Sequence, residues 1–308
     1  MAERRRIWSQ RGDVLGRISR LIAVAILIGV VLSQVIYYVV NFHPIDTLSY
    51  SWAGESWRTT GNPYTEAPFR VGDHPIYRYA PWFAVPWVGL SLLPYNFLEL
   101  GWTSLMVACA FVAVVPLFRA HGMRAVPFGG FILGWLVAIG LNGNVQPAMI
   151  ALLAWGVERR WGPAAIAVCA SLKAVPILYA VVYAGRGEWG KVALTVGITA
   201  VLVAPMLMFE IPAISTDAGN TWSLYSTSVA LWGGVALAAA AGAYFAARTR
   251  FGWALAGASV VLALPRAFFY DLTFILPGIA ESPSTPVASR APVVDHRASG
   301  SDGASTSA

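Results

Sequence analysis

Long apolar runs separated by short polar connections fill the chain from residue 21 to residue 280. The first run, 21–45, holds 25 residues without a formal charge and follows a segment that contains six arginines. A helix rises 1.5 Å per residue, so about 20 apolar residues match a hydrocarbon core of roughly 30 Å. The pattern therefore predicts an all-α integral membrane protein, a polytopic helical bundle of about ten spans. We place the spans near 21–41, 98–118, 126–141, 146–157, 163–172, 174–185, 191–209, 228–247, 252–264 and 267–280.

Several of these spans are short or broken by proline. Such segments are tolerated at membrane depth only where they pack inside protein or line a cavity. Residues 42–97 form the predicted first extracytoplasmic loop, with a short amphipathic surface helix at 47–58. The stretch 80–93 carries two prolines and three aromatic residues, which suit the membrane interface better than a crossing.

The two ends of the chain differ in composition from its middle. Residues 1–20 form a basic segment that we predict to be cytoplasmic, and the run after it is too long for a signal peptide. Residues 281–308 are rich in Ser, Ala, Pro and Gly, which predicts a disordered cytoplasmic tail. Cys109 and Cys169 lie inside apolar runs, so we expect buried thiols and no disulfide.

Composition and charge support a multi-pass protein of the plasma membrane. Hydrophobic residues make up 57% of the chain and charged residues 12%, whereas soluble domains have about 25% charged residues. The formal charge of +6 does not indicate nucleic acid, because the arginines form short clusters between apolar runs. With a cytoplasmic N-terminus, 16 of the 21 basic residues fall on the cytoplasmic side, as the positive-inside rule expects.

Five basic residues remain outside or within the membrane, and they are candidates for function. A lysine inside a membrane costs roughly 2.5–3.5 kcal/mol, so Lys173 should face a cavity or a counter-charge. Arg266 begins another broken segment, and Asp46 is the first charge after the first span. The five residues are Arg58, Arg70, Arg78, Lys173 and Arg266.

The order and spacing of several motifs resemble glycosyltransferase family 87 over residues 40 to 280. The first loop contributes an aspartate just after the first span, a tyrosine four residues later, and the sequences GNPY at 61–64 and YAP at 79–81. The sequences NGNVQ at 142–146, ASLKAVP at 170–176 and LPR at 264–266, with Tyr270 and Asp271, complete the resemblance.

The resemblance implies the type C glycosyltransferase fold and transfer of a sugar, most typically mannose, from a polyprenyl-phosphate donor. The acceptor would be an envelope glycolipid or polysaccharide, and the reaction would invert the anomeric centre. Asp46 would be the general base, and Lys173, Arg266 and Arg78 would bind the donor phosphate. We expect no cofactor and no metal, because no second carboxylate stands beside Asp46 in the sequence. The predicted substrate-binding residues are Tyr50, Tyr64, Tyr79, Asn142, Asn144, Gln146, Tyr270 and Asp271.

Several of these residues also have a purely structural interpretation. Asp46 can cap the helix that follows it, Lys173 can extend to the interface, and the Asn-Gly sequence at 142–143 is typical of a tight turn. Asp73 and His74 are predicted to be ordinary loop residues.

Three other functions remain open. An arabinofuranosyltransferase would use the same type of donor. A small-solute transporter would need internal symmetry and polar groups reachable from both sides, and we see no such repeat. A non-enzymatic membrane protein is the third, because the chain is short for the family and has Tyr270-Asp271 where family members usually carry histidine nearby.

Overall fold

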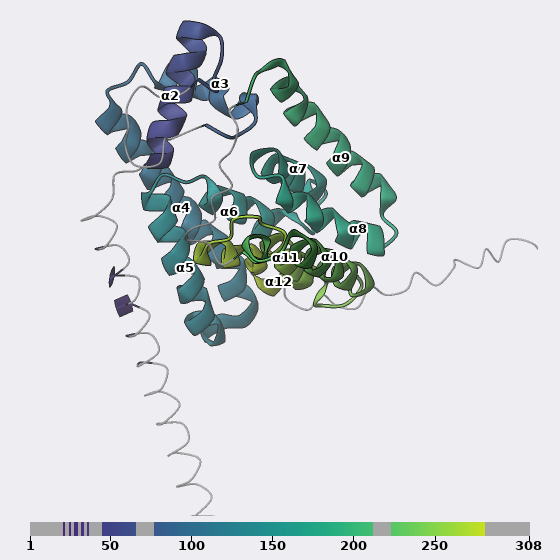
Figure 1. Ribbon diagram of the computed structural model, residues 1–308. Helices are drawn as coiled ribbons and strands as arrows, with labels where there is room; N and C mark the ends of the chain where they lie inside the picture. Colours follow the sequence, from purple (N-terminus) through teal and green to yellow (C-terminus); the bar gives the residue numbers. More distant parts are fainter. Residues whose placement is uncertain are drawn as a thin grey trace, which may run out of the picture.

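The computed structural model describes residues 45–65, 77–211 and 223–280, together with a few isolated positions between 21 and 36. Within these ranges every regular element is helical and none is a strand, so the predicted all-α class is confirmed there (Figure 1). The N-terminal segment 1–20, most of the first predicted span and the tail 281–308 lie outside the described residues, as do Arg70, Asp73 and His74.

The helices follow the predicted boundaries closely. Each predicted span beyond residue 97 corresponds to one helix or to a helix joined to a 3-10 turn, and 126–141 coincides with α5. The α-helices are α2 (Ile45–Thr60), α3 (Pro81–Leu90), α4 (Tyr95–His121), α5 (Val126–Leu141), α6 (Gln146–Gly156), α7 (Gly162–Leu172), α8 (Ala180–Gly185), α9 (Trp189–Val203), α10 (Val229–Phe245), α11 (Gly252–Leu262) and α12 (Leu276–Ala280). The 3-10 helices are η1 (Gly122–Ala125), η2 (Val175–Tyr179), η3 (Ala204–Met208), η4 (Leu224–Ser226) and η5 (Phe269–Ile275).

Two helical segments among the described residues are long and apolar enough to cross a membrane. Tyr95–Leu141 joins α4, η1 and α5 over 47 residues, and Trp189–Met208 joins α9 and η3 over 20 residues. The other apolar helices have 10–17 residues, fewer than the roughly 20 that one straight crossing needs.

Proline explains where several of the short helices begin. Pro127, Pro147 and Pro163 each occupy one of the first two positions of a helix, in α5, α6 and α7. Proline suits the first turn because its fixed φ is helical and its missing N–H would have no partner there. The apolar sequence is therefore divided into helices whose starts are set locally.

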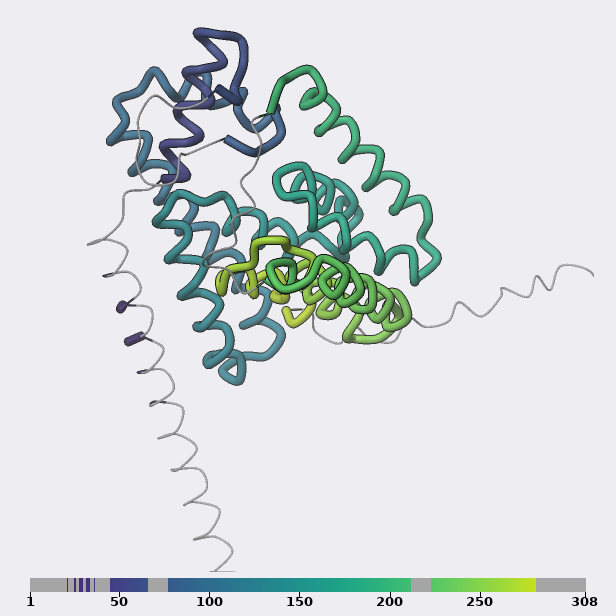
Figure 2. The backbone as a smooth tube through the Cα atoms, viewed as in Figure 1, coloured from purple at the N-terminus to yellow at the C-terminus, as the bar shows by residue number. Residues whose placement is uncertain are grey.

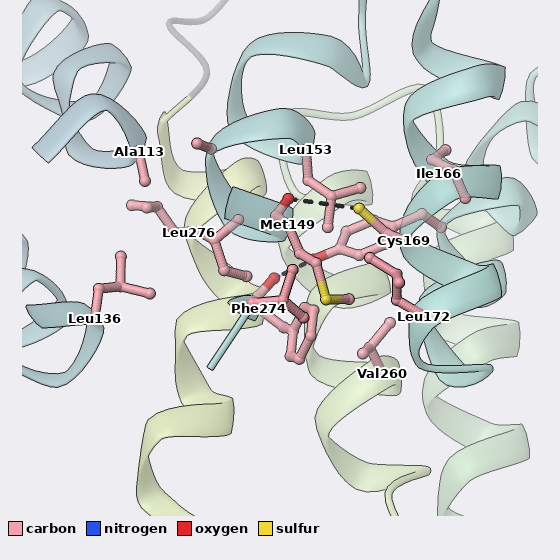
Figure 3. Close-up of a cluster of buried hydrophobic side chains, with 14 of the residues drawn as sticks. Ala113, Leu136, Met149, Leu153, Ile166, Cys169, Leu172, Val260, Phe274 and Leu276 are labelled. Carbon is pink, nitrogen blue, oxygen red and sulfur yellow. Dashed lines mark hydrogen bonds between the residues drawn. The ribbon is translucent and has the colours of Figure 1, made fainter. Parts of the chain in front are cut away.

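The core joins helices that are distant in the sequence. Helix α4 packs against α5 and α6, α11 packs against α10, α12 and η5, and α7 packs against α9 (Figure 1). Figure 3 shows side chains from these elements meeting, with the buried Cys169 thiol donating to the Met149 carbonyl over 3.5 Å. In Figure 2, α9 runs along one edge of the molecule.

Helix α2 is the helix predicted at 47–58, and one of its faces is enclosed by protein. Tyr50, Ala53 and Gly54 are buried, and α2 packs against α3 and α4, whereas Glu55 and Arg58 are exposed. The approach to α3 is close, because a Cβ added to Gly54 would lie 2.2 Å from the Trp87 carbonyl oxygen.

The contact at Gly54 gives a stability prediction. Gly54→Ala should destabilise the protein by about 1–3 kcal/mol, because the backbone of α3 must move to admit the methyl group. The thermal unfolding midpoint of purified protein measures this effect. Gly101→Ala in α4 is the matched control, since a Cβ there meets nothing within 4 Å. Equal midpoints for the two variants would contradict the α2–α3 packing.

Candidate active site

The turn between α5 and α6 lies directly against the first turn of α2. Gly143 has a φ of 79°, a region that favours glycine, and a Cβ there would lie 1.9 Å from the Thr47 Oγ1 atom. The Trp102 indole N–H donates to the Gly143 carbonyl over 2.6 Å. The Asn-Gly turn expected from the sequence is therefore present, and it fits only a residue without a side chain.

This turn holds the Asp46 carboxylate through two amides. The Nδ2 atoms of Asn142 and Asn144 both donate to Asp46 Oδ2, over 3.1 Å and 3.0 Å. Among the described residues nothing donates to Asp46 Oδ1, and none of the hydrogen bonds of the carboxylate goes to the backbone of α2. The half-buried Asp46 is thus oriented by the turn through one of its two carboxylate oxygens.

Burial raises the pKa of Asp46 above its ordinary value. The hydrogen bond from Asn144 and then the positive charge of Lys173 act in the opposite direction. The Asn144 amide and the Lys173 ammonium therefore offset only part of the desolvation of this carboxylate.

A chain of hydrogen bonds connects Asp46 to Lys173. Asn144 Oδ1 accepts from the Gln146 backbone N–H over 2.9 Å, and Gln146 Oε1 accepts from Lys173 Nζ. Gln146 Nε2 donates to the Tyr270 carbonyl over 3.1 Å and to Thr273 Oγ1 over 3.0 Å. The fully buried Gln146 thereby ties α6 to η5 and to the residue that ends α7.

Lys173 has the counter-charge that its position in an apolar region requires. Its ammonium lies 3.6 Å from Asp271 Oδ1, and their side chains are 20% and 2% exposed. The Nζ atom also lies 5.6 Å from the ring centroid of Tyr270 and 5.9 Å from that of Phe274. Asp271 Oδ2 accepts from the Phe268 N–H over 2.9 Å, which fixes the start of η5.

Arg78 and Arg266 come close enough to influence each other. Partial desolvation of the guanidinium, and after it the positive charge of Arg266, lower the pKa of Arg78. Arg78 is exposed just before α3, and Arg266 is half-buried between α11 and η5. Two neighbouring like charges favour a site that an anion can occupy.

Three tyrosines are joined by hydrogen bonds, and one of them, Tyr79, lies near enough to Asp46 and Arg78 to be influenced by both charges. The Tyr50 hydroxyl donates to the Tyr79 hydroxyl over 3.2 Å, and the Tyr64 hydroxyl donates to the Tyr79 carbonyl over 2.8 Å. Burial and then the charge of Asp46 raise the pKa of Tyr79. Tyr50 and Tyr64 are enclosed by protein, whereas Tyr79 is partly exposed.

The structure brings all twelve predicted site residues into one region, and it adds residues that the sequence analysis missed. Thr273 accepts from Gln146, Thr47 lies against Gly143, and Ser171 Oγ accepts from the Trp82 indole N–H over 3.0 Å, linking α7 to α3. In the sequence, the one sign that these three residues belong to the site is that each lies within two positions of a predicted site residue, and that sign is weak.

Comparisons of the chain with protein-family models, with curated proteins and with solved structures each find no match. In the described part of the chain, no group of three His, Cys, Asp or Glu side chains is placed to hold a metal ion.

The raised pKa of Asp46 predicts that this residue lowers the stability of the protein at neutral pH. A carboxyl whose pKa is higher in the folded state than in the unfolded state costs stability once the unfolded chain ionises. Asp46→Asn should therefore raise the thermal unfolding midpoint near pH 7, and the difference should vanish below about pH 4. Glu55→Gln, on the exposed face of the same helix, is the control. A lower midpoint for Asp46→Asn near pH 7 would contradict the assignment.

Proposed function

We propose that this protein is a membrane glycosyltransferase that moves a sugar, most typically mannose, from a polyprenyl-phosphate donor to an envelope glycolipid or glycan. The arrangement of Asp46 carries the proposal, because one carboxylate oxygen is anchored by two amides and the other has no partner among the described residues. The resemblance of the motifs to glycosyltransferase family 87 supplies the reaction type, and the neighbouring cations support it.

The proposal places the chain in the plasma membrane as a bundle of about ten spans. Two segments are long enough to cross, and the shorter apolar helices pack against other helices, as broken segments at membrane depth must. Apolar side chains on α9 also face outward, including Leu194 at 52% and Val201 at 72% exposure. Such surfaces are costly in water and suit lipid.

In the proposed reaction an acceptor hydroxyl attacks the anomeric carbon of the donor sugar. Asp46 Oδ1 accepts the hydroxyl proton as the new glycosidic bond forms. The bond between the anomeric carbon and the phosphate oxygen breaks, and polyprenyl phosphate leaves with that electron pair. Attack opposite the leaving group inverts the anomeric centre. A general base of this kind contributes about 10²–10⁴-fold to the rate.

Cations near the leaving phosphate would stabilise the charge that grows on its oxygens. Arg78 and Arg266 repel each other, so an anion between them relieves that repulsion. Lys173 keeps a phosphate role in the proposal, although Asp271 offsets part of its charge.

Among the remaining candidate residues, exposure distinguishes those that can contact substrate from those that support them. Tyr79, Asn142 and Tyr270 are partly exposed, so we assign them to contacts with the sugar or the acceptor. The others are enclosed by protein, so in this proposal they hold the groups that touch substrate. These enclosed residues are Tyr50, Tyr64, Asn144, Gln146 and Asp271.

Loss of the proposed base should abolish most of the transfer. Membranes that contain wild type or Asp46→Asn are incubated with radiolabelled polyprenyl-phosphate sugars, and the label in lipid and polysaccharide fractions is counted. We expect Asp46→Asn to be slower by about 10²–10⁴-fold and Glu55→Gln to match wild type. Equal transfer by Asp46→Asn and wild type would remove Asp46 from the mechanism, and no transfer by wild type with any donor would refute the proposal.

The pH profile tests how Asp46 is held. The base must be ionised, so the rate should fall on the acid side as the pH drops through its pKa. The Asn144 hydrogen bond lowers the pKa of Asp46, so Asn144→Ala should move this acid limb to higher pH. The measurement is the transfer rate between pH 4 and pH 9. An Asn144→Ala profile that keeps the wild-type acid limb would show that the limb does not report Asp46.

A further inference from the structure

A second polar cluster lies where three turns meet: the turn between α6 and α7, the turn between α8 and α9, and the turn between α10 and α11. The Arg186 guanidinium pairs with Glu158 over 2.7 Å and donates through Nε to the Ala247 carbonyl over 2.8 Å. The Trp253 indole N–H also donates to Glu158. These contacts hold together the α6–α7, α8–α9 and α10–α11 turns, so the residues of these turns share one surface.

Positive charge is in excess on this surface. Its two carboxylates are already paired, Glu158 with Arg186 and Glu188 with Lys191 over 2.9 Å. Four further arginines are exposed in the same turns, and no carboxylate of the described residues forms an ion pair with them. We call these four the arginine rim: Arg159, Arg160, Arg248 and Arg250.

Exposed aromatic rings interrupt the arginine rim. Trp161 follows Arg160 and is 44% exposed, and Phe251 follows Arg250 and is 54% exposed. The Arg250 guanidinium carbon lies 4.7 Å from the ring centroid of Phe251. Trp189, at the start of α9, is 61% exposed. The indole rings of Trp161 and Trp189 have an apolar body and a polar N–H, and such rings, set among arginines, suit the headgroup depth of a bilayer.

We propose that the arginine rim binds the headgroups of anionic phospholipids. The apolar exposed faces of α9 and α10 lead to the same turns, with Val201 at 72% and Leu237 at 73% exposure, so acyl chains can lie beside the helices. A nucleic acid or an acidic protein would match the charge and leave these apolar faces in water. Phospholipid with a negative headgroup matches both features. This assignment does not depend on the proposed transferase reaction.

Lipid titration of the purified full-length protein in detergent tests the proposal. Native mass spectrometry follows stepwise binding of phosphatidylglycerol and of phosphatidylcholine. Wild type should prefer phosphatidylglycerol, and Arg159→Gln/Arg248→Gln should weaken the first binding step by about 25-fold, since one basic residue near an anionic leaflet is worth about fivefold in affinity. Equal affinity of wild type for the two lipids, or an unchanged double variant, would overturn the proposal.

Matched variants distinguish binding at the arginine rim from a general effect of the positive charge of the protein. Arg290→Gln/Arg297→Gln removes the same charge from the tail and should bind phosphatidylglycerol like wild type, whereas equal weakening would overturn the proposal. Arg159→Lys/Arg248→Lys should retain the preference. The Arg159→Gln/Arg248→Gln variant should keep the wild-type unfolding midpoint in phosphatidylcholine, which would show that its weaker lipid binding does not come from a loss of folding. Full competition by soluble glycerol phosphate would assign the surface to free phosphate and overturn the lipid assignment.

Discussion

The two amide hydrogen bonds to Asp46 Oδ2 are the interaction on which the site depends. They require the α5–α6 turn to lie against α2, and that approach requires glycine at position 143, where a side chain would strike Thr47. A carboxylate removed from water needs donors to stay ionised, and two amides leave its second oxygen available. One tight turn thus determines where the charge sits and which of its oxygens can take a proton.

The same turn links the acid to the cations. Gln146 follows it by one position and binds Lys173, and Lys173 pairs with Asp271 at the start of η5. Breaking one link would leave a buried charge or amide without its partner, which usually costs more than the bond itself contributes. The stability of this network and the geometry of the proposed reaction therefore rest on the same contacts.

The sequence predicted the helices well because the residues that set where a helix begins or ends lie at that same end of the helix. Proline in the first turns of α5, α6 and α7 and the break at 142–145 set helix ends without reference to the fold. It also selected Asp46 and Lys173 as candidates from charge in apolar surroundings. It could not show that Asn144, 98 positions along the chain, binds Asp46, since contacts between distant segments arise only from packing. The number of membrane crossings is not fixed by helix length either, because a short apolar helix that packs against other helices need not cross the membrane by itself.

The most direct test of the account is to find where the donor phosphate binds. Membranes containing the protein are irradiated with a polyprenyl-phosphate mannose analogue that carries a diazirine beside the phosphate, and the labelled peptides are identified by mass spectrometry. If the donor phosphate binds between these cations, label should appear on peptides that contain Arg78, Lys173 or Arg266 and should be suppressed by excess unlabelled donor. Label confined to the arginine rim or to the outward faces of α9 and α10 would contradict the account.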